Sequence, residues 1–399
     1  MLDQQFARTR ADVAPRRRIG LDLHVVDGLY QGSRTHCLEL FSRVIQLTPE
    51  CDFVLFLDQP SRLQQFSESF SLSNVHAVRM PHASPAMRLL FQLPELVRRE
   101  KIDLLHTQYI IPAFLRCRTA VTIHDILFES HPQYFDRMFV ARSRILVRRS
   151  ARRSAEIFTV SEFSKEQIVT RYGVSPNRIH TIFNSVDGNR FFPGEDGLAL
   201  VRATGLIPGE YFLTVGRLEP RKNHANILKA WAMLPSPRPR LVIVGQKHFG
   251  HEEVLRLSAN LGLADDVTFL GDVPDEHLPS YFRNAKGFVY CSWAEGFGMP
   301  VLEAMASGVP VISSPHTALL EVCGDAALMV SPDSTAAIRD AIIAVNTQHN
   351  LRTCLIQRAI ERIKSYSWTK AASIVREVYL SRLNVNESLI NSAVRSREE

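Results

Sequence analysis

Residues 287–314 read GFVYCSWAEGFGMPVLEAMASGVPVISS, and this stretch decides the fold. A buried, strand-like run leads through Gly296 and Gly298 into Pro300, which suits the first turn of a helix. Gly308 suits the end of that helix, and another apolar run follows it. The pattern therefore predicts a strand, a loop, a helix and a second strand, the unit from which parallel α/β sheets are built.

The same alternation of apolar runs and helical patterns extends along the chain, and it predicts parallel sheets flanked by helices. In the first half we expect strands at 18–26, 53–58, 75–80, 103–108, 120–125 and 156–161, and helices at 35–47, 87–100, 137–153 and 164–173. In the second half we expect strands at 211–216, 240–245, 267–271, 287–292, 309–314 and 327–331, and helices at 225–234, 252–262, 275–285, 301–308, 318–323 and 335–347.

The 399 residues exceed the size at which one hydrophobic core usually keeps growing, so we expect two domains. A stretch rich in Gly, Pro and Asp at about 184–210 predicts the linker between them. We place two doubly wound, Rossmann-like α/β domains at 16–190 and 208–366. Residues 367–383 form a further amphipathic helix, and we expect the tail at 384–399 to be poorly ordered.

Composition narrows the class of protein. The six cysteines show no paired spacing, which argues against a zinc site and a disulfide framework and favours the cytoplasm. No apolar stretch has the length of a signal peptide or a membrane span. The net charge of +6 is mild, and no recognition motif accompanies it, so we expect no nucleic-acid partner.

The positive charge is densest in residues 137–153, where seven arginines alternate with apolar side chains. One interpretation is a solvated helix face that packs through its apolar side. The other is a peripheral membrane contact, in which the arginines attract anionic lipid headgroups at the inner face of the cytoplasmic membrane. Both interpretations remain open from the sequence.

Two features predict a site for a diphosphate. The glycine loop and the helix start after it favour an anion, and Arg217 and Lys222 follow another strand in the same half of the chain. The loop is not a dinucleotide or Walker A motif, because Val301 replaces the third glycine and no Gly-Lys-Ser/Thr occurs. Glu295 and Glu303 would repel phosphate but accept hydrogen bonds from hydroxyls, and a sugar nucleotide has hydroxyls on both sides of its diphosphate.

EGFGMPVLE and VGRLEPRKNH together resemble the E-x7-E retaining glycosyltransferases of family GT4. The segments TIHDILF, TVSEFSKEQI, VTFLGDVPDEHLPSYF and SYSWTKAA resemble that family in the expected order, and the similarity covers residues 19–383. The resemblance implies a GT-B fold, with two facing Rossmann-like domains and a final helix that crosses back to the first.

The resemblance also implies roles for matching residues. Glu303 would bind the ribose and Glu295 the transferred sugar, while Arg217 and Lys222 hold the diphosphate and His124 lies near the sugar and the acceptor. Further donor contacts would come from Gly298, Met299, Val301 and the segment Gly271–Val273. In the first-strand loop the family usually has paired glycines, and here Gly32 stands between Gln31 and Ser33. Gly32 would still lie in the cleft, against the donor phosphate or the acceptor.

No D-x-D pair for a metal occurs, and we expect metal-independent transfer with retention and without a cofactor beyond the nucleotide-sugar substrate. The last third of the chain looks most like bacterial mannosyltransferases, which favours GDP-mannose as donor. The acceptor would be a glycan or a lipid-linked sugar in cell-surface polysaccharide synthesis. A sugar-nucleotide 2-epimerase and a non-catalytic sugar-nucleotide-binding protein are the alternatives.

Overall fold

The computed structural model describes residues 16–28 and 32–385. Its strands form two sheets, and both are parallel. The first sheet has the order β3-β2-β1-β4-β5-β6-β7, with β1 Arg18–Asp22, β2 Asp52–Leu57, β3 Val75–Arg79, β4 Leu104–Gln108, β5 Arg118–Thr122, β6 Glu156–Thr159 and β7 Ile179–Thr181. The second has the order β10-β9-β8-β11-β12-β13, with β8 Tyr211–Val215, β9 Arg240–Val244, β10 Val267–Gly271, β11 Gly287–Tyr290, β12 Val311–Ser313 and β13 Ala327–Met329.

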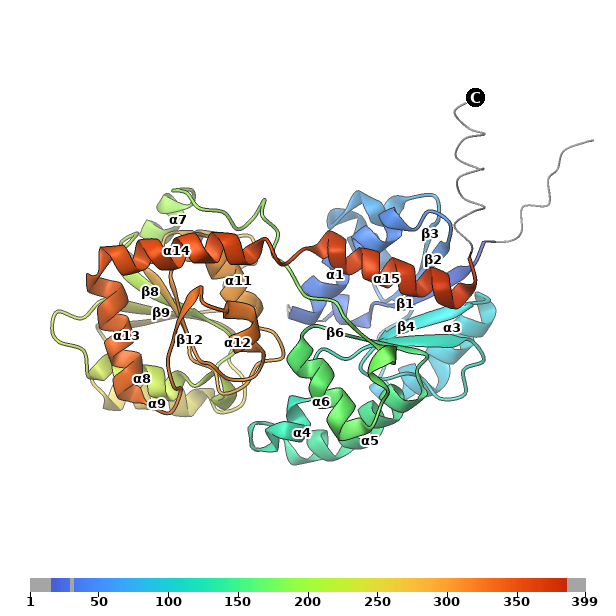
Figure 1. The fold of residues 1–399 in the computed structure, drawn as a ribbon, viewed down its shortest axis with the longest axis horizontal. Helices are drawn as coiled ribbons and strands as arrows, with labels where there is room; N and C mark the ends of the chain where they lie inside the picture. Colours follow the sequence, from blue (N-terminus) through green and yellow to red (C-terminus); the bar gives the residue numbers. More distant parts are fainter. Residues whose placement is uncertain (1–15, 29–31, 386–399) are drawn as a thin grey trace, which may run out of the picture. The chain divides into compact units, whose positions relative to one another are not determined.

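Helices connect most of these strands (Figure 1). The first seven are α1 Gly32–Leu47, α2 Pro85–Met87, α3 Leu93–Arg99, α4 Leu127–Ser130, α5 Arg137–Arg153, α6 Glu162–Tyr172 and α7 Leu198–Ala203. The others are α8 His224–Ala232, α9 His251–Asn260, α10 Leu278–Arg283, α11 Met299–Ala306, α12 Ala318–Cys323, α13 Thr335–Thr347, α14 His349–Ile363 and α15 Trp368–Leu383. The alternation of strands and helices confirms the expected α/β class with two Rossmann-like parallel sheets.

Several details differ from the expectation. Strand β7 and helices α4, α7 and α14 were not expected, and α7 lies within the stretch predicted as a linker. The helix expected at 87–100 is interrupted, because residues Arg88–Gln92 form a π-helical turn before α3. Pro94 explains the interruption, since it has no N–H to continue the regular hydrogen-bond ladder.

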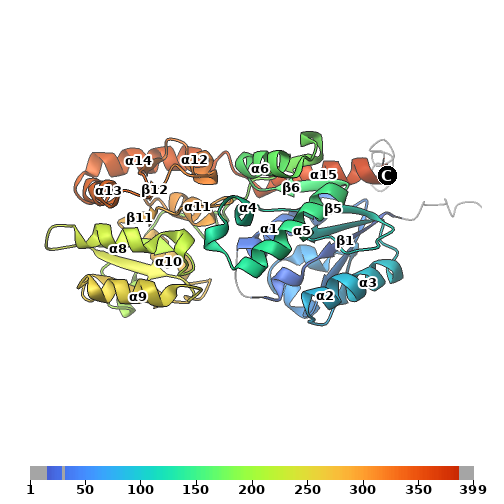
Figure 2. The same ribbon diagram turned by 90° about the horizontal axis from the view of Figure 1, so that it is seen from below.

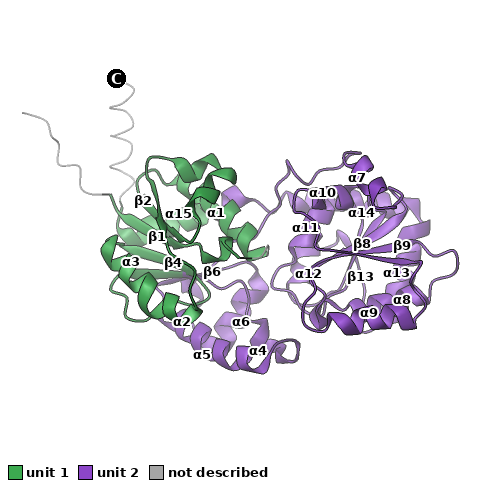
Figure 3. Ribbon diagram, turned by 180° about the vertical axis from the view of Figure 1, so that it is seen from behind, with its two compact units in different colours: residues 1–120, 372–399 green, residues 121–371 purple. Residues whose placement is uncertain are grey.

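The contacts of the chain define two units, residues 1–120 with 372–399 and residues 121–371 (Figure 3). In unit 1, α3 packs on one face of the sheet through a core that includes Phe56 and Leu105. His106 contacts the aromatic rings of Phe41 from α1 and Tyr379 from α15. The larger part of α15 therefore belongs to unit 1, whereas the domain limits 16–190 and 208–366 stay a prediction.

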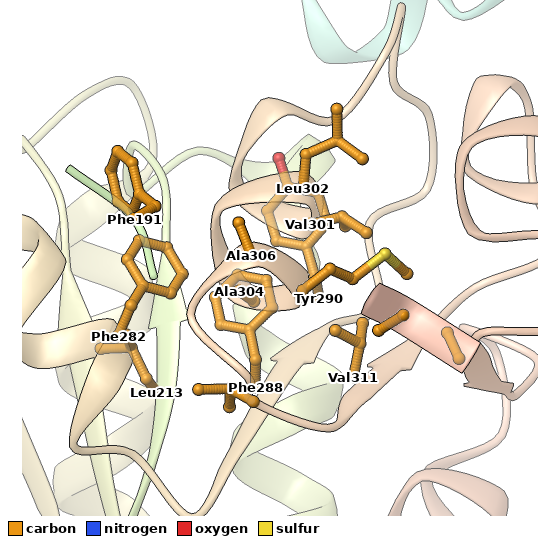
Figure 4. Close-up of a cluster of buried hydrophobic side chains, with 14 of the residues drawn as sticks. Phe191, Leu213, Phe282, Phe288, Tyr290, Val301, Leu302, Ala304, Ala306 and Val311 are labelled. Atoms are coloured by element: carbon orange, nitrogen blue, oxygen red, sulfur yellow. The ribbon is translucent and has the colours of Figure 1, made fainter. Parts of the chain in front are cut away.

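In unit 2, helices cover both faces of the six-stranded sheet (Figure 2). Successive side chains of a strand point to opposite faces, so Phe212 belongs to one core and Leu213 to the other. Helices α8, α9 and α13 cover the first core, and α10, α11 and α14 cover the second. Figure 4 shows the second core, where Phe288 and Tyr290 of β11 lie among side chains of α11.

In the part of the chain that the structure describes, none of the helices combines the length and the apolar character needed to cross a bilayer.

Candidate active site

The six-stranded sheet reverses its winding between β8 and β11, because β9 and β10 extend it on one side and β12 and β13 on the other. Ligands of open parallel sheets bind at such a switch point, beyond the carboxyl ends of the strands. The loop 216–223 follows β8 and the loop 291–298 follows β11. These loops carry Arg217, Lys222 and Glu295, so three of the expected site residues leave the sheet at its switch point.

The loop after β11 has two glycines that its packing requires. A Cβ atom on Gly296 would lie 2.4 Å from a carboxylate oxygen of Asp125. Gly298 has a φ of 104°, in the left-handed region, and its Cβ would lie 2.6 Å from Leu319. The hydroxyl of Ser161 donates to the carbonyl oxygen of Gly296 at 2.8 Å. The loop is therefore held closely against three other segments of unit 2.

Helix α11 begins directly after this loop. Its N-cap residue is Gly298, which has no side chain that could cap the helix. The amide of Val301 donates to the carbonyl oxygen of Gly298 at 2.9 Å, and Pro300 has no N–H to offer. The first amides of a helix have no partner within the helix and favour anions. The expected phosphate contacts are thus best supplied by the amides of Gly298 and Met299, with that of Val301 engaged in the turn.

Glu295 is buried and lies between two cations. Its Oε2 atom accepts a hydrogen bond from Nη1 of Arg221 at 2.8 Å, and its Oε1 atom accepts one from Nζ of Lys222 at 2.8 Å. Burial alone would raise the pKa of Glu295, but Arg221 and Lys222 together lower it to about 2. The carboxylate is therefore ionised and held in position by the two cations.

Lys222 is held by an aromatic hydroxyl as well. Its Nζ donates to the hydroxyl of Tyr290 at 2.7 Å and lies 5.0 Å from the centre of that ring. The side chain runs over Gly216, where a Cβ would be 3.3 Å from Cε of Lys222. Burial lowers the pKa of Lys222 more than Glu295 raises it.

Glu303 lies on α11 in a different environment. It is buried, and it makes no hydrogen bond or ion pair to the residues that the structure describes beyond its own backbone. Burial raises the pKa of Glu303 to about 8, Asp275 adds to the effect, and Arg190 opposes it. Asp275 itself pairs with Arg190 at 2.8 Å. A buried carboxyl group without a partner is available to the hydroxyls of a ligand.

Asp125 and His124 follow β5; His124 is buried, and Asp125 is partly buried. Asp125 accepts a hydrogen bond from the amide of Leu127 at 3.0 Å and packs against Gly296. Burial raises the pKa of Asp125, with Glu295 adding to the effect and the two cations of the 216–223 loop opposing it. The side chain of Asp125 therefore lies directly against the glycine loop at Gly296.

The remaining expected residues lie at the ends of other elements. Arg217 is partly exposed, and among the described residues its side chain has no hydrogen bond or ion pair. Gly271 ends β10 with a φ of 69°, and Val273 packs on the edge of the second core. Gly32 starts α1 in unit 1, while Gln31 beside it lies outside the described residues.

Sequence reasoning missed Arg221, and it did not select Asp125 or Tyr290. Arg221 donates to Glu295, to Glu219 at 2.6 Å and to the carbonyl oxygen of Ala294. The Pro-Arg-Lys triplet at 220–222 did signal two adjacent cations, but the sequence does not tell that both turn inward to Glu295. No group of three His, Cys, Asp or Glu side chains that could hold a metal ion occurs within residues 16–28 and 32–385.

Comparisons with known proteins identify the family models that fit the chain. Residues 206–362 match the model "Glycosyl transferases group 1", and residues 30–190 match "Glycosyltransferase Family 4". The O-antigen chain mannosyltransferase B of Escherichia coli is 31% identical over 336 residues, which are 81% of this chain and 88% of that protein.

Solved structures show the same fold at low identity. Sucrose-phosphate synthase from Thermosynechococcus elongatus is 18% identical, with a TM-score of 0.74 over 93% of this chain and 100% of that one. HepE from Anabaena, solved with UDP-glucose, is 17% identical, with a TM-score of 0.73 over 91% of this chain and 99% of that one. These likenesses confirm the expected GT-B fold.

Proposed function

The chain belongs to the family 4 glycosyltransferases, and we propose that it transfers a hexose, mannose, from a nucleotide-sugar donor to a hydroxyl of a glycan or lipid-linked acceptor in cell-surface polysaccharide synthesis. The observation that carries the proposal is the contrast between its two acids. Glu295 is ionised between Arg221 and Lys222, whereas Glu303 is buried without a partner. That contrast suits two groups that recognise different parts of one ligand.

Donor binding follows from the placement of these groups. The ribose hydroxyls would bind Glu303, and the base would lie against the segment Gly271–Val273. Arg217, Lys222 and the start of α11 would bind the diphosphate, since they supply cations and amide donors at one edge of the sheet. Mannose as the transferred sugar and GDP as its carrier are supported by the similarity to an O-antigen mannosyltransferase.

The transfer itself breaks the bond between the anomeric carbon and the diphosphate oxygen. Arg217 and Lys222 stabilise the charge that develops on the leaving group, so no metal ion is needed for that role. The acceptor hydroxyl attacks from the same face, its proton passes to the departing phosphate oxygen, and configuration is retained. Glu295 orients the sugar through its hydroxyls, and His124 lies near the sugar and the acceptor. A trapped covalent glycosyl-enzyme adduct would contradict this single-step attack.

The function is tested with a panel of radiolabelled sugar nucleotides, membrane lipid extract, and parallel samples with and without a chelator. We expect label from GDP-mannose in the lipid or glycan fraction, at equal rates in both samples. Label recovered only as an isomerised nucleotide would indicate an epimerase. If no donor is turned over, the chain is a non-catalytic sugar-nucleotide-binding protein. Loss of transfer in the samples with chelator would contradict metal independence.

We also propose that α5 contacts an anionic membrane surface. Its exposed side includes Met138 and Ile145, which are 82% and 70% exposed although they are apolar. Within the described part of the chain Arg142, Arg149 and Arg153 have no hydrogen bond or ion pair. Exposed apolar side chains beside unpaired arginines suit the boundary between headgroups and acyl chains.

The contact is tested by co-sedimentation with vesicles that contain anionic lipid. Arg148 and Arg152 donate to backbone oxygens of α6, so they are left intact and the changed residues are Arg142, Arg149 and Arg153, each to Gln. We expect the triple variant to lose most vesicle binding at low salt. If the triple variant binds vesicles as well as the wild type does, the proposed membrane contact of α5 is wrong. The proposed localisation at the inner membrane face then loses its support.

A further inference from the structure

Glu295 has two cationic partners, Arg221 and Lys222, and we infer that they have different tasks in the reaction. Arg221 holds Glu295 in place throughout the reaction, whereas Lys222 leaves Glu295 to bind the donor diphosphate. Arg221 is thus a positioning residue for the acid that orients the sugar. The inference rests on the proposed function, because it concerns a diphosphate donor at this switch point.

Arg221 is anchored on several sides. Its Nη1 donates to Glu295 and to the carbonyl oxygen of Ala294, and its Nη2 donates to Glu219. Its own carbonyl oxygen accepts a hydrogen bond from the amide of Trp293 at 2.9 Å. The side chain is only 16% exposed. A planar guanidinium held by this many groups is a rigid support, and moving it would take one cationic partner from both Glu295 and Glu219.

Lys222 is held by fewer groups. The side chain makes hydrogen bonds only through its terminal Nζ, to Glu295 and to the hydroxyl of Tyr290. One of the three N–H donors of Nζ therefore remains for another acceptor. Its flexible stem crosses Gly216, where no side chain blocks its movement. An ammonium group is a point charge that can exchange one oxygen partner for another. Lys222 can therefore turn from Glu295 to a phosphate oxygen at the same strand end.

The two tasks together keep the charge of Glu295 balanced while the donor is bound. Once the diphosphate has taken Lys222, Glu295 is a buried carboxylate that still needs a cation. The ionisable groups around it are Arg221, Lys222, Asp125, Tyr290 and, behind Arg221, Glu219. Of the two cations, Arg221 is the one that hydrogen bonds to Ala294 and Glu219 also hold in place. It keeps Glu295 ionised and oriented as an acceptor for the hydroxyls of the transferred sugar.

The test compares Arg221→Met with Lys222→Met, using the full chain and the donor that the nucleotide panel identifies. We expect Lys222→Met to weaken GDP binding, measured by calorimetry, by about tenfold or more, because a charge-assisted hydrogen bond is lost. We expect Arg221→Met to change the Kd for GDP by less than about threefold but to lower kcat by about 100-fold, because a reacting group is misplaced.

The pH profile supplies a readout that a purely structural role would not change. Loss of Arg221 removes a charge that lowers the pKa of Glu295, so the acid limb of kcat should move to higher pH. Arg221→Lys keeps the charge and should return the limb towards that of the wild type. Arg256→Met, an exposed change of the same type on α9, is the matched control.

Two results would overturn the inference. One is that Arg221→Met weakens GDP binding as much as Lys222→Met, which would place Arg221 on the diphosphate. The other is an unchanged kcat and acid limb in Arg221→Met. If Arg221→Met does not fold, Arg221→Gln, which also removes the charge, decides between the same outcomes through kcat and the Kd for GDP. A wild-type chain that transfers sugar from no donor would contradict the proposed function instead.

Discussion

Glu295 and Glu303 are eight positions apart in the chain, yet their surroundings shift their pKa values in opposite directions. Two buried cations lower the pKa of Glu295 to about 2, whereas burial and Asp275 raise that of Glu303 to about 8. Neither shift depends on sequence neighbours, because the groups responsible come from other loops. The same residue type is therefore prepared for two forms of recognition, one by a fixed anion and one by a carboxyl group that can donate as well as accept.

Replacing each acid with alanine separates the two roles. We expect Glu303→Ala to weaken donor binding by roughly tenfold, since ribose hydrogen bonds are lost, with a smaller change in kcat. We expect Glu295→Ala to lower kcat by roughly 100-fold. The change in the Kd for GDP should be smaller, because GDP ends at the diphosphate and carries no sugar for Glu295 to bind. Calorimetry with GDP and initial rates of transfer measure both. The opposite pattern would mean that the two roles are interchanged.

The raised pKa of Glu303 also predicts how stability depends on pH. In the unfolded chain this carboxyl group loses its proton near its ordinary pKa of 4.5, whereas the folded chain keeps it to about 8. The unfolded state therefore binds fewer protons between these values, so the contribution of Glu303 to stability falls as the pH rises from about 4.5 to 8. Glu303→Gln removes that titration.

We expect Glu303→Gln to raise the melting temperature at pH 8, by on the order of 5 °C for a few kcal/mol, and to leave it nearly unchanged at pH 5. Calorimetric scans of the wild type and the variant at both pH values measure the difference. Exposed Glu252→Gln on α9 is the matched control, for which we expect no pH-dependent difference. An equal shift at pH 5 and pH 8 would contradict the assignment of the titration to Glu303.

At the scale of elements, the apolar patterns were sufficient to predict the two sheets and most helices. Strand β7 has only three residues, and no long apolar run marks it. The interrupted helix before α3 depends on one missing N–H at Pro94, which is a local detail inside an otherwise helical pattern. Motif residues at strand ends, such as Lys222 and Glu295, were predicted because a parallel sheet brings its carboxyl ends to one edge.

The same argument shows why Arg221 was missed. A strand-end loop with two consecutive cations can turn one or both of them inward, and the result depends on the acceptors that lie around it. Here those acceptors are Glu219, Glu295 and the carbonyl oxygen of Ala294. Asp125 was not selected for a similar reason, because its contact with Gly296 joins segments 171 positions apart. Long-range packing of this kind leaves no periodic signal in the sequence.

The glycine loop provides a prediction at this scale. In Gly296→Ala the new methyl group would lie 2.4 Å from Asp125, so the loop or the carboxylate must shift. We expect a loss of about 1–3 kcal/mol in the free energy of unfolding, together with a large loss of transfer activity. Gly188→Ala is the control, because a Cβ there meets nothing within 4 Å and its φ is not positive. Unfolding by urea and initial rates measure both variants, and full activity in Gly296→Ala would refute the close packing.

At the scale of the whole molecule, every residue proposed to bind the donor except Gly32 lies in unit 2, which comprises residues 121–371. The seven arginines of α5 belong to the same unit. Unit 1 supplies Gly32 and most of α15. The proposed donor site therefore lies mainly in one unit, and a ligand that binds there should stabilise that unit in particular.

Ligand-linked stability tests this prediction on the full chain. A ligand that binds only the folded state stabilises it by about 2.7 kcal/mol at a concentration of 100 Kd. For a unit of this size that gives a rise of roughly 6 °C in the melting temperature. We expect GDP to produce such a rise in calorimetry, UDP at the same concentration to produce a smaller one, and Glu303→Ala to reduce the effect of GDP. If the chain melts in two transitions, only the one that belongs to residues 121–371 should move. A larger rise with UDP would contradict GDP as the carrier, and an undiminished rise in Glu303→Ala would remove Glu303 from the donor site.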